Sequence, residues 1–267
     1  MNYDQRHYAS DLTDAQWDLI KNLLPAPLEG GRPRSTNVRQ VCNGIFYLNK
    51  TGCQWRYLPT VYPPWQTVYG YYAAWKKGGN WEKMNAKFSR EVRLLEDKRE
   101  YPTAGIVDSQ SVKSMNKGPE RGFDGGKLVK GRKRHILVDT LGLVLGVVVT
   151  SANTGDRDGL NLLLNKIPIK ILKLLELIWA DQGYTGEIIS WVATTFQLIL
   201  SIVKRLPEQV GFKLLPKRWM VERTFGWFNF YRRLAKDYED LPQNSETMIY
   251  ITMVQIMLRR LAPLDTS

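Results

Sequence analysis

The sequence predicts an α/β fold in which a small all-α domain precedes a mixed sheet flanked by helices. Apolar residues recur at helical spacing from the start of the chain to about residue 95. Short β-branched runs begin only after the charged stretch EDKREYPTA, and strand and helix patterns then alternate toward the C-terminus. We therefore expect two domains, at residues 1–98 and 99–267.

Four helices are expected in the N-terminal domain, at residues 14–24, 38–50, 65–77 and 81–96. Thr13 and Gln16 have the spacing of a capping box, which opens the first helix. Asn37 is placed to cap the second helix, and Gly78-Gly79 separates the last two.

The third helix is rich in tyrosine and ends in Lys76-Lys77, which is compatible with a helix-turn-helix reader of DNA. The alternative is a plain helical bundle. In that bundle the helix would bury aromatic side chains that recur at helical spacing, namely Trp65, Tyr69, Tyr72 and Trp75.

The C-terminal domain is expected to begin with three strands, at residues 105–107, 135–139 and 143–150. Leu141-Gly142 is a natural tight turn between the last two strands, so these form a hairpin. Two more strands are expected at residues 174–181 and 198–205, with helices at residues 157–167, 186–196, 217–238 and 245–261.

Composition limits the classes of function. The chain has 267 residues, a net charge of +12 and a pI near 9.6, a balance that indicates an anionic partner, most often nucleic acid. Cys42 and Cys53 form no CxxC pair, so we expect reduced thiols and no zinc cluster. No apolar run is long enough to span a bilayer and the N-terminus is polar, so a cytoplasmic protein is expected.

Two aspartates follow predicted strands. Asp108 comes after the run AGIV, and Asp181 comes after LIWA and before Gln182-Gly183-Tyr184. Functional groups gather beyond the carboxyl ends of strands in open α/β sheets. Two acids on adjacent strand ends could therefore share a metal ion.

Glu222 is a third candidate, on the predicted helix 217–238. Helical spacing places it on one polar stripe with Arg218, Gly226, Asn229 and Arg233. The alternative reading is an ordinary solvated pair between Arg218 and Glu222. Three carboxylates would suit Mg²⁺ or Mn²⁺, two of which can activate a nucleophile and stabilise the leaving oxygen in phosphodiester cleavage.

Other acids compete with these three. Asp139 lies at the predicted hairpin turn, where aspartate commonly bonds the local backbone, and a structural role is expected for it. Asp156 and Asp158 follow another strand, and spacing alone does not exclude them.

Four segments, in order, carry a family resemblance: IVDSQSVK, GGKLVKGRKRHILVDTLG, IWADQGYTGE and RWMVERTFGWFNFYRRLAKDYE. Together they resemble the DDE transposases of bacterial insertion sequences, in particular the compact group often called IS-five. The stretches SDLTDAQWDLIKNLLP and GIFYLNKTGCQWRYLP resemble the helical leader domain of that group. The resemblance extends from about residue 8 to residue 262.

This resemblance implies a ribonuclease-H-like fold with Asp108, Asp181 and Glu222 as a catalytic, metal-binding triad for two Mg²⁺ or Mn²⁺ ions. It implies a transposase that cleaves and joins double-stranded DNA at terminal inverted repeats and at a target, as a homodimer or higher oligomer in the bacterial nucleoid. Arg218 and Arg223 would contact phosphate or a DNA hairpin beside Glu222.

The sequence departs from the family pattern at two places. Gln182-Gly183-Tyr184 stands where Gly-Gly-Tyr is frequent. Related groups place a tyrosine seven residues before the glutamate and a lysine seven residues after it, where this chain has Leu215 and Asn229. Arg233 and Lys236 are the candidates for the lysine role.

Residues 113–134 are strongly basic, with a net charge of +6, half of the chain's +12. Five glycines predict a flexible loop that embraces DNA near the active site through phosphate contacts, the alternative being a solvated loop. We expect DNA contacts from this segment, from the basic loop at residues 31–37 and from the region of Glu222, through Lys113, Lys127, Lys130, Arg132, Lys133, Arg134, Arg32, Arg34, Arg218, Arg223, Arg233 and Lys236.

Two other functions remain open. A DNA-binding regulator derived from a transposase would bind DNA without metal-dependent chemistry. A nuclease of the same fold would cut DNA without joining it.

Overall fold

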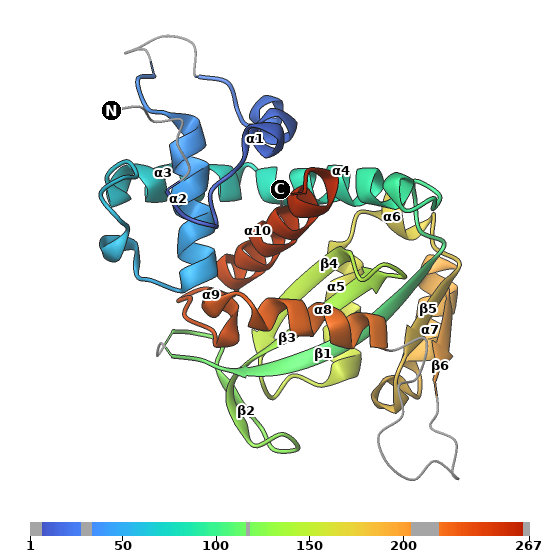
Figure 1. Ribbon diagram of the computed structural model, residues 1–267. Helices are drawn as coiled ribbons and strands as arrows, with labels where there is room; N and C mark the ends of the chain where they lie inside the picture. Colours follow the sequence, from blue (N-terminus) through green and yellow to red (C-terminus); the bar gives the residue numbers. More distant parts are fainter. Residues whose placement is uncertain (1–6, 28–33, 116–117, 204–218, 264–267) are drawn as a thin grey trace.

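A computed structural model of the chain describes residues 7–27, 34–115, 118–203 and 219–263 (Figure 1). The N-terminal region contains α1 (Asp14–Ile20), η1 (Lys21–Leu23), α2 (Val38–Thr51), η2 (Trp55–Tyr57), α3 (Trp65–Lys77) and α4 (Asn80–Leu95). Thr13 and Gln16 form the expected capping box, and the Asn37 side chain accepts from the Gln40 amide at the start of α2. The predicted helices are therefore confirmed to within a few residues.

The strands are β1 (Ala104–Lys113), β2 (Gly122–Asp124), β3 (Val129–Asp139), β4 (Val144–Ser151), β5 (Leu177–Ala180) and β6 (Ile199–Ile202). Both β1 and β4 pair antiparallel with β3, and β5 and β6 continue the sheet from β1 in parallel. The remaining helices are α5 (Asp156–Lys166), α6 (Ile169–Leu172), η3 (Gln182–Tyr184), α7 (Ile188–Phe196), α8 (Trp219–Asn229), α9 (Arg232–Ala235) and α10 (Pro242–Leu261). An antiparallel meander extended by parallel strands and covered by helices is the ribonuclease-H-like arrangement that was expected.

The two faces of the sheet bury different helices. On one face Ile106, Ile136 and Val138 pack in a cluster with side chains of α4, α8 and α10. On the other face Val107 and Leu137 pack against α5 and α7. Because successive strand residues point to opposite faces, the odd- and even-numbered residues of β1 serve different helices.

The N-terminal helices share the first of these cores. Ile45 and Phe46 of α2 and Trp81 of α4 belong to the same buried cluster as Met253 of α10 and Ile106 of β1. Figure 1 shows α10 lying between the helical region and the sheet. The boundary at residues 98/99 follows a change of composition and stays a prediction, whereas the hydrophobic core is continuous across it.

Two local predictions are corrected by the structure. Residues 122–124 and 129–134 are strand rather than flexible loop, because β1 pairs with β3 as far as Lys113 and Gly131. A Cβ atom at Gly131 would lie 2.0 Å from the Val112 carbonyl oxygen, so this glycine permits close strand approach rather than flexibility. The same extension places Asp108 in the middle of a ten-residue strand, not at its end.

The predicted helix at 217–238 is interrupted within its described part. The chain leaves α8 after Asn229, and the amides of Phe230 and Tyr231 donate to carbonyls three residues back, which tightens the last turn. Tyr231 is extended, and a separate short helix, α9, begins at Arg232. Arg233 therefore does not continue the stripe that carries Glu222.

Candidate active site

Asp108 lies on β1, and Asp181 directly follows the neighbouring strand β5. The parallel register joins Ala104 to Leu177 and Ile106 to Trp179. Alternate strand residues point the same way, so Asp108 shares the face of Ile106, which α8 covers. The same offset, continued past the end of β5, would bring Asp181 beside Asp108, and both carboxylates act on the hydroxyl of Tyr184.

Asp181 is held in a fixed turn. It caps the short helix η3, and its Oδ1 accepts a hydrogen bond from the Gly183 amide at 2.8 Å. The residue after a strand would otherwise be mobile, so this cap orients the carboxylate at the end of β5.

Glu222 lies in the first turn of α8 and is exposed. Its neighbours Val221 and Phe225 are buried in the cluster on the Asp108 face. Thr224 Oγ1 donates to the Gly142 carbonyl at 2.8 Å, which fixes α8 against the turn between β3 and β4. Asp108 lies on a strand of the sheet and Asp181 follows its neighbour, whereas Glu222 lies on a helix that packs over β1 and β3; Figure 1 shows β1, β5 and α8.

Tyr184 adds a buried hydroxyl to this region. Its side chain is 1% exposed, and the hydroxyl lies near that of Ser109 with no well-directed hydrogen bond among the described residues. Burial raises its pKa well above the usual value, and the negative charges of Asp108, Asp156 and Asp181 raise it further. Three carboxylates thus raise the pKa of one buried hydroxyl.

Asp156 is the third acid near Tyr184. Its Oδ1 accepts from Ser109 Oγ at 2.7 Å and lies 3.4 Å from Lys133 Nζ. Asp156 was one of the acids that spacing alone did not exclude as a catalytic residue. Its proximity to Asp181 could not be inferred from the sequence, because α5 and β5 are separate elements along the chain.

The donor set suits a hard divalent cation, since Mg²⁺ and Mn²⁺ prefer carboxylate oxygens. The orphaned hydroxyl of Tyr184 is the kind of buried polar atom found beside such an ion. Over the described ranges, no three His, Cys, Asp or Glu side chains are gathered closely enough to form a metal-binding group. An ion shared by Asp108, Asp181 and Glu222 therefore stays a prediction.

Asp139 has a structural environment. Its side chain is 0% exposed, and Oδ1 accepts from the amides of Leu141 and Leu143 in the turn between β3 and β4. Oδ2 accepts from Arg93 of α4 at 2.5 Å. Burial raises the pKa of this carboxyl, and both of its oxygens accept hydrogen bonds from the protein.

Several cations expected to contact DNA have exposed side chains. Lys113 and Lys130 lie at the outer ends of β1 and β3, and Lys127 lies in the turn between β2 and β3. Lys236 follows α9, and Arg34 precedes α2. Lys127 Nζ also donates to the Ser109 carbonyl at 3.3 Å, which keeps it beside the strand that carries Asp108.

Four other predicted cations are buried, and this corrects their assignment as direct DNA contacts. Arg132 is 1% exposed and donates to the carbonyls of Pro119, Glu239 and Asp240. Arg134 is equally buried and donates to the Leu234 carbonyl at 2.8 Å. Such guanidinium groups have no surface left for a phosphate.

Lys133 and Arg233 are buried in ion pairs. Lys133 lies between Asp124 and Asp156, at 3.8 and 3.4 Å. Arg233 Nε lies 2.6 Å from Glu239 Oε1, and Arg233 Nη1 donates to the Cys53 carbonyl at 3.2 Å. Of the two candidates for the family lysine, only Lys236 presents an exposed side chain.

Arg223 is half-buried in an aromatic stack. Its guanidinium lies 4.4 Å from the ring centre of Trp219 and 4.9 Å from that of Trp227, and it donates to the Leu141 carbonyl at 2.9 Å. These contacts anchor α8. A contact between Arg223 and DNA stays a prediction. Arg32, Arg218 and Leu215 lie outside the described residues.

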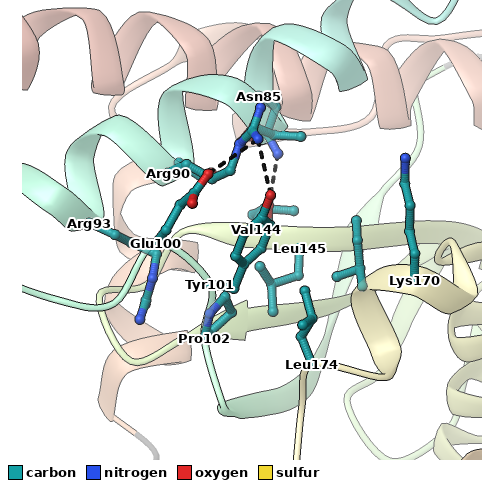
Figure 2. A pocket seen from close by; sticks show the side chains of 13 residues that line it. Asn85, Arg90, Arg93, Glu100, Tyr101, Pro102, Val144, Leu145, Lys170 and Leu174 are labelled. Carbon is teal, nitrogen blue, oxygen red and sulfur yellow. Dashed lines mark hydrogen bonds and ion pairs between the residues drawn. The ribbon is translucent and has the colours of Figure 1, made fainter.

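A cavity of about 440 Å³ lies elsewhere, between α4, β4 and α6. Figure 2 shows its lining, in which Arg90 interacts with Glu100 and Tyr101 beside the apolar Leu145 and Leu174. The lining contains none of the three predicted catalytic acids. The cavity is therefore separate from the candidate active site.

Comparison with known proteins gives matches over most of the chain. Residues 101–257 match the family model described as "Transposase DDE domain", and residues 12–85 match "Putative transposase of IS4/5 family". A protein of Burkholderia cepacia named "Putative transposase for insertion sequence element IS402" is 31% identical over 153 residues, covering 55% of this chain and 69% of the relative. The "Insertion element IS402 uncharacterized 16.2 kDa protein" of the same organism is 29% identical over 42% of this chain and 78% of its own length.

Among solved structures, a chain described as "Crystal structure of a pre-cleavage Mos1 transpososome" is similar at 12% identity and a TM-score of 0.29, with coverage of 89% of this chain and 80% of the other. A superposition at that score transfers no residue roles. The family model for the DDE domain covers more than half of the sequence, so the chain belongs to the DDE transposases of the IS4/5 insertion-sequence family.

Proposed function

We propose that this transposase binds the terminal inverted repeats of its insertion sequence and catalyses metal-dependent cleavage and strand transfer of double-stranded DNA. The observation that carries the proposal is the β1–β5 register, because the same offset continued past the end of β5 would bring Asp181 beside Asp108. Family membership supports the same chemistry.

Asp108, Asp181 and Glu222 would hold two Mg²⁺ or Mn²⁺ ions. When bound, such ions supply an activated water or 3′-hydroxyl and stabilise the leaving oxygen. The chain's own part is positioning: η3 orients Asp181 through the Gly183 amide, and the stacked Arg223 fixes α8.

The DNA backbone would lie across the exposed lysines that flank this face. Lys113, Lys127 and Lys130 border β1, and Lys236 follows α9. Such contacts neutralise phosphates without reading sequence. Synapsis of two element ends further leads us to propose a dimer or larger complex on DNA, acting in the bacterial cytoplasm on the nucleoid.

The proposal is tested with the purified full chain, Mg²⁺ and a duplex carrying the end of its own element. Nicking at the element boundary is expected for the wild type and joining for a pre-cut end. Asp108→Asn, Asp181→Asn and Glu222→Gln should each abolish both activities while leaving duplex binding intact. Metal-dependent nicking that survives in these variants would contradict the triad, and nicking without joining would favour a nuclease.

A further inference from the structure

We propose that Asp156 is a positioning residue of this metal site, whose negative charge beside the turn that carries Asp181 strengthens binding of the divalent cation. The inference rests on the proposed function, because it concerns the same site. It assigns to the first turn of α5 a role that neither the family resemblance nor the three-acid pattern includes.

One oxygen of Asp156 is fixed by the protein. Oδ1 accepts from Ser109 Oγ at 2.7 Å and lies 3.4 Å from Lys133 Nζ. Ser109 follows Asp108 directly on β1, so the bond ties α5 to the strand that carries the first catalytic acid. Lys133 also donates to the Thr154 carbonyl at 2.8 Å, which holds the loop before α5 against β3.

The other oxygen of Asp156 faces the turn that carries Asp181. A Cβ atom built at Gly183 would lie 3.2 Å from Asp156 Oδ2 and 3.0 Å from Asp181 Oδ1. Both oxygens therefore border the small space that the missing side chain leaves open. Any larger residue would press on the two carboxylates.

The hydroxyl of Tyr184 is an independent observation that points to a ligand here. It is buried to 1% exposure, lacks a well-directed hydrogen bond and lies within the electrostatic influence of Asp108, Asp156 and Asp181. A cation with its water shell would give this hydroxyl a partner and would screen the three carboxylates from one another.

Lys133 is not dedicated to Asp156. It is shared with Asp124, whose Oδ2 lies 3.8 Å from the same ammonium. Asp124 is itself held by Ser111 and by the amides of Gly126 and Lys127. Lys127 also acts on Asp124, and the oxygen of Asp156 that Lys133 contacts is Oδ1, whereas the oxygen that borders Gly183 is Oδ2.

The experiment measures Mn²⁺ binding to the full chain without DNA, by calorimetry and by the loss of the free-ion resonance signal. Asp156→Asn keeps the shape and an acceptor for Ser109, and we expect its Mn²⁺ dissociation constant to rise about tenfold. Asp158→Asn is the matched control, because Asp158 is exposed in the same first turn of α5. The control removes the same helix-terminal charge and should bind Mn²⁺ as the wild type does.

An unchanged dissociation constant in Asp156→Asn would overturn the inference, and so would an equal rise in both variants. Ser109→Ala retains the acid but frees it, and should weaken Mn²⁺ binding by a smaller factor. If Asp156→Asn does not fold, as judged by its metal-free melting curve, unchanged binding in Ser109→Ala overturns the inference. Failure of the proposed function looks different: Asp181→Asn would then bind Mn²⁺ as tightly as the wild type.

Discussion

Arg93 and Asp139 form a buried ion pair that joins the helical N-terminal region to the sheet. Arg93 Nη1 at the end of α4 lies 2.5 Å from Asp139 Oδ2 at the end of β3, and the two side chains are 6% and 0% exposed. Arg93 Nε also donates to the Arg99 carbonyl at 2.8 Å. The pair spans residues 98/99, so the stability of the sheet depends on the helices before it.

We expect Arg93→Met to lower the free energy of unfolding by about 3–5 kcal/mol, because it leaves the Asp139 carboxylate buried without its counter-ion. Urea unfolding followed by circular dichroism measures the change. In the double variant Arg93→Met/Asp139→Asn much of the loss should be recovered, since the amide oxygen still accepts from Leu141 and Leu143. Additive losses in the double variant would contradict the pairing.

His135 predicts a specific pH dependence of stability. Burial lowers its pKa from 6.5 to about 4, with smaller effects from Asp156, Lys133 and Lys127. Between these pH values the unfolded chain binds a proton that the folded chain does not. Stability should therefore fall as pH drops from about 6.5 toward 4, by about 3 kcal/mol over the full window.

His135→Gln tests this dependence, because glutamine can still bond the Thr150 hydroxyl, which lies 3.1 Å from the histidine Nε2. The variant should show a flatter curve of unfolding free energy against pH in that window. Other groups titrate there too, so the difference between the two curves is the relevant quantity. Parallel curves would mean that His135 is not buried in its neutral form.

Gly159 on α5 is predicted to tolerate no side chain. A Cβ atom there would lie 2.1 Å from Cε1 and Nδ1 of the buried His135 ring. We expect Gly159→Ala to destabilise the protein by about 1–3 kcal/mol despite the better helix propensity of alanine. Gly70→Ala on the exposed face of α3 is the control, since nothing lies within 4 Å of its Cβ position, and it should be neutral or stabilising. The melting temperatures of both variants measure these changes, and an unchanged melting temperature in Gly159→Ala would contradict the prediction.

Substitutions of two neighbouring cations on β3 should have different effects, one on DNA binding and the other on stability. Lys130→Ala removes an exposed cation, so we expect weaker DNA binding, a salt-dependence slope smaller by about 1 and an unchanged melting temperature. Arg132→Ala breaks the buried contacts to Asp237 and to the Glu239 carbonyl, and should instead lower the melting temperature. Fluorescence anisotropy measures DNA binding, and thermal melting measures stability. If Arg132→Ala weakened DNA binding without lowering the melting temperature, Arg132 would belong to the surface of the protein that binds DNA.

Periodicity located most of the elements because each helix and strand buries a face of its own. The capping residues Thr13 and Asn37 and the turn at Leu141-Gly142 were readable for the same local reason. The interior position of Asp108 was not readable, since the polar run after it resembles a loop until β3 pairs with it.

The candidate site, too, could be predicted only in part from the sequence. The burial of Arg132 and Arg134 depends on carbonyl groups about a hundred residues later in the chain, which local patterns do not reveal. The approach of Asp156 to Asp181 is likewise a tertiary contact. Glu222 emerged from the order of family segments, because its own helix reads equally well as a solvated face.

The most direct test of the central claim is the metal specificity of Asp181→Cys in nicking of the element's own end. A thiolate is a poor ligand for Mg²⁺ and a better one for Mn²⁺. We predict that the variant loses nicking in Mg²⁺ and regains it in Mn²⁺, while the wild type nicks in both. Nicking by the variant in Mg²⁺ at the wild-type rate would show that Asp181 does not hold the catalytic ion.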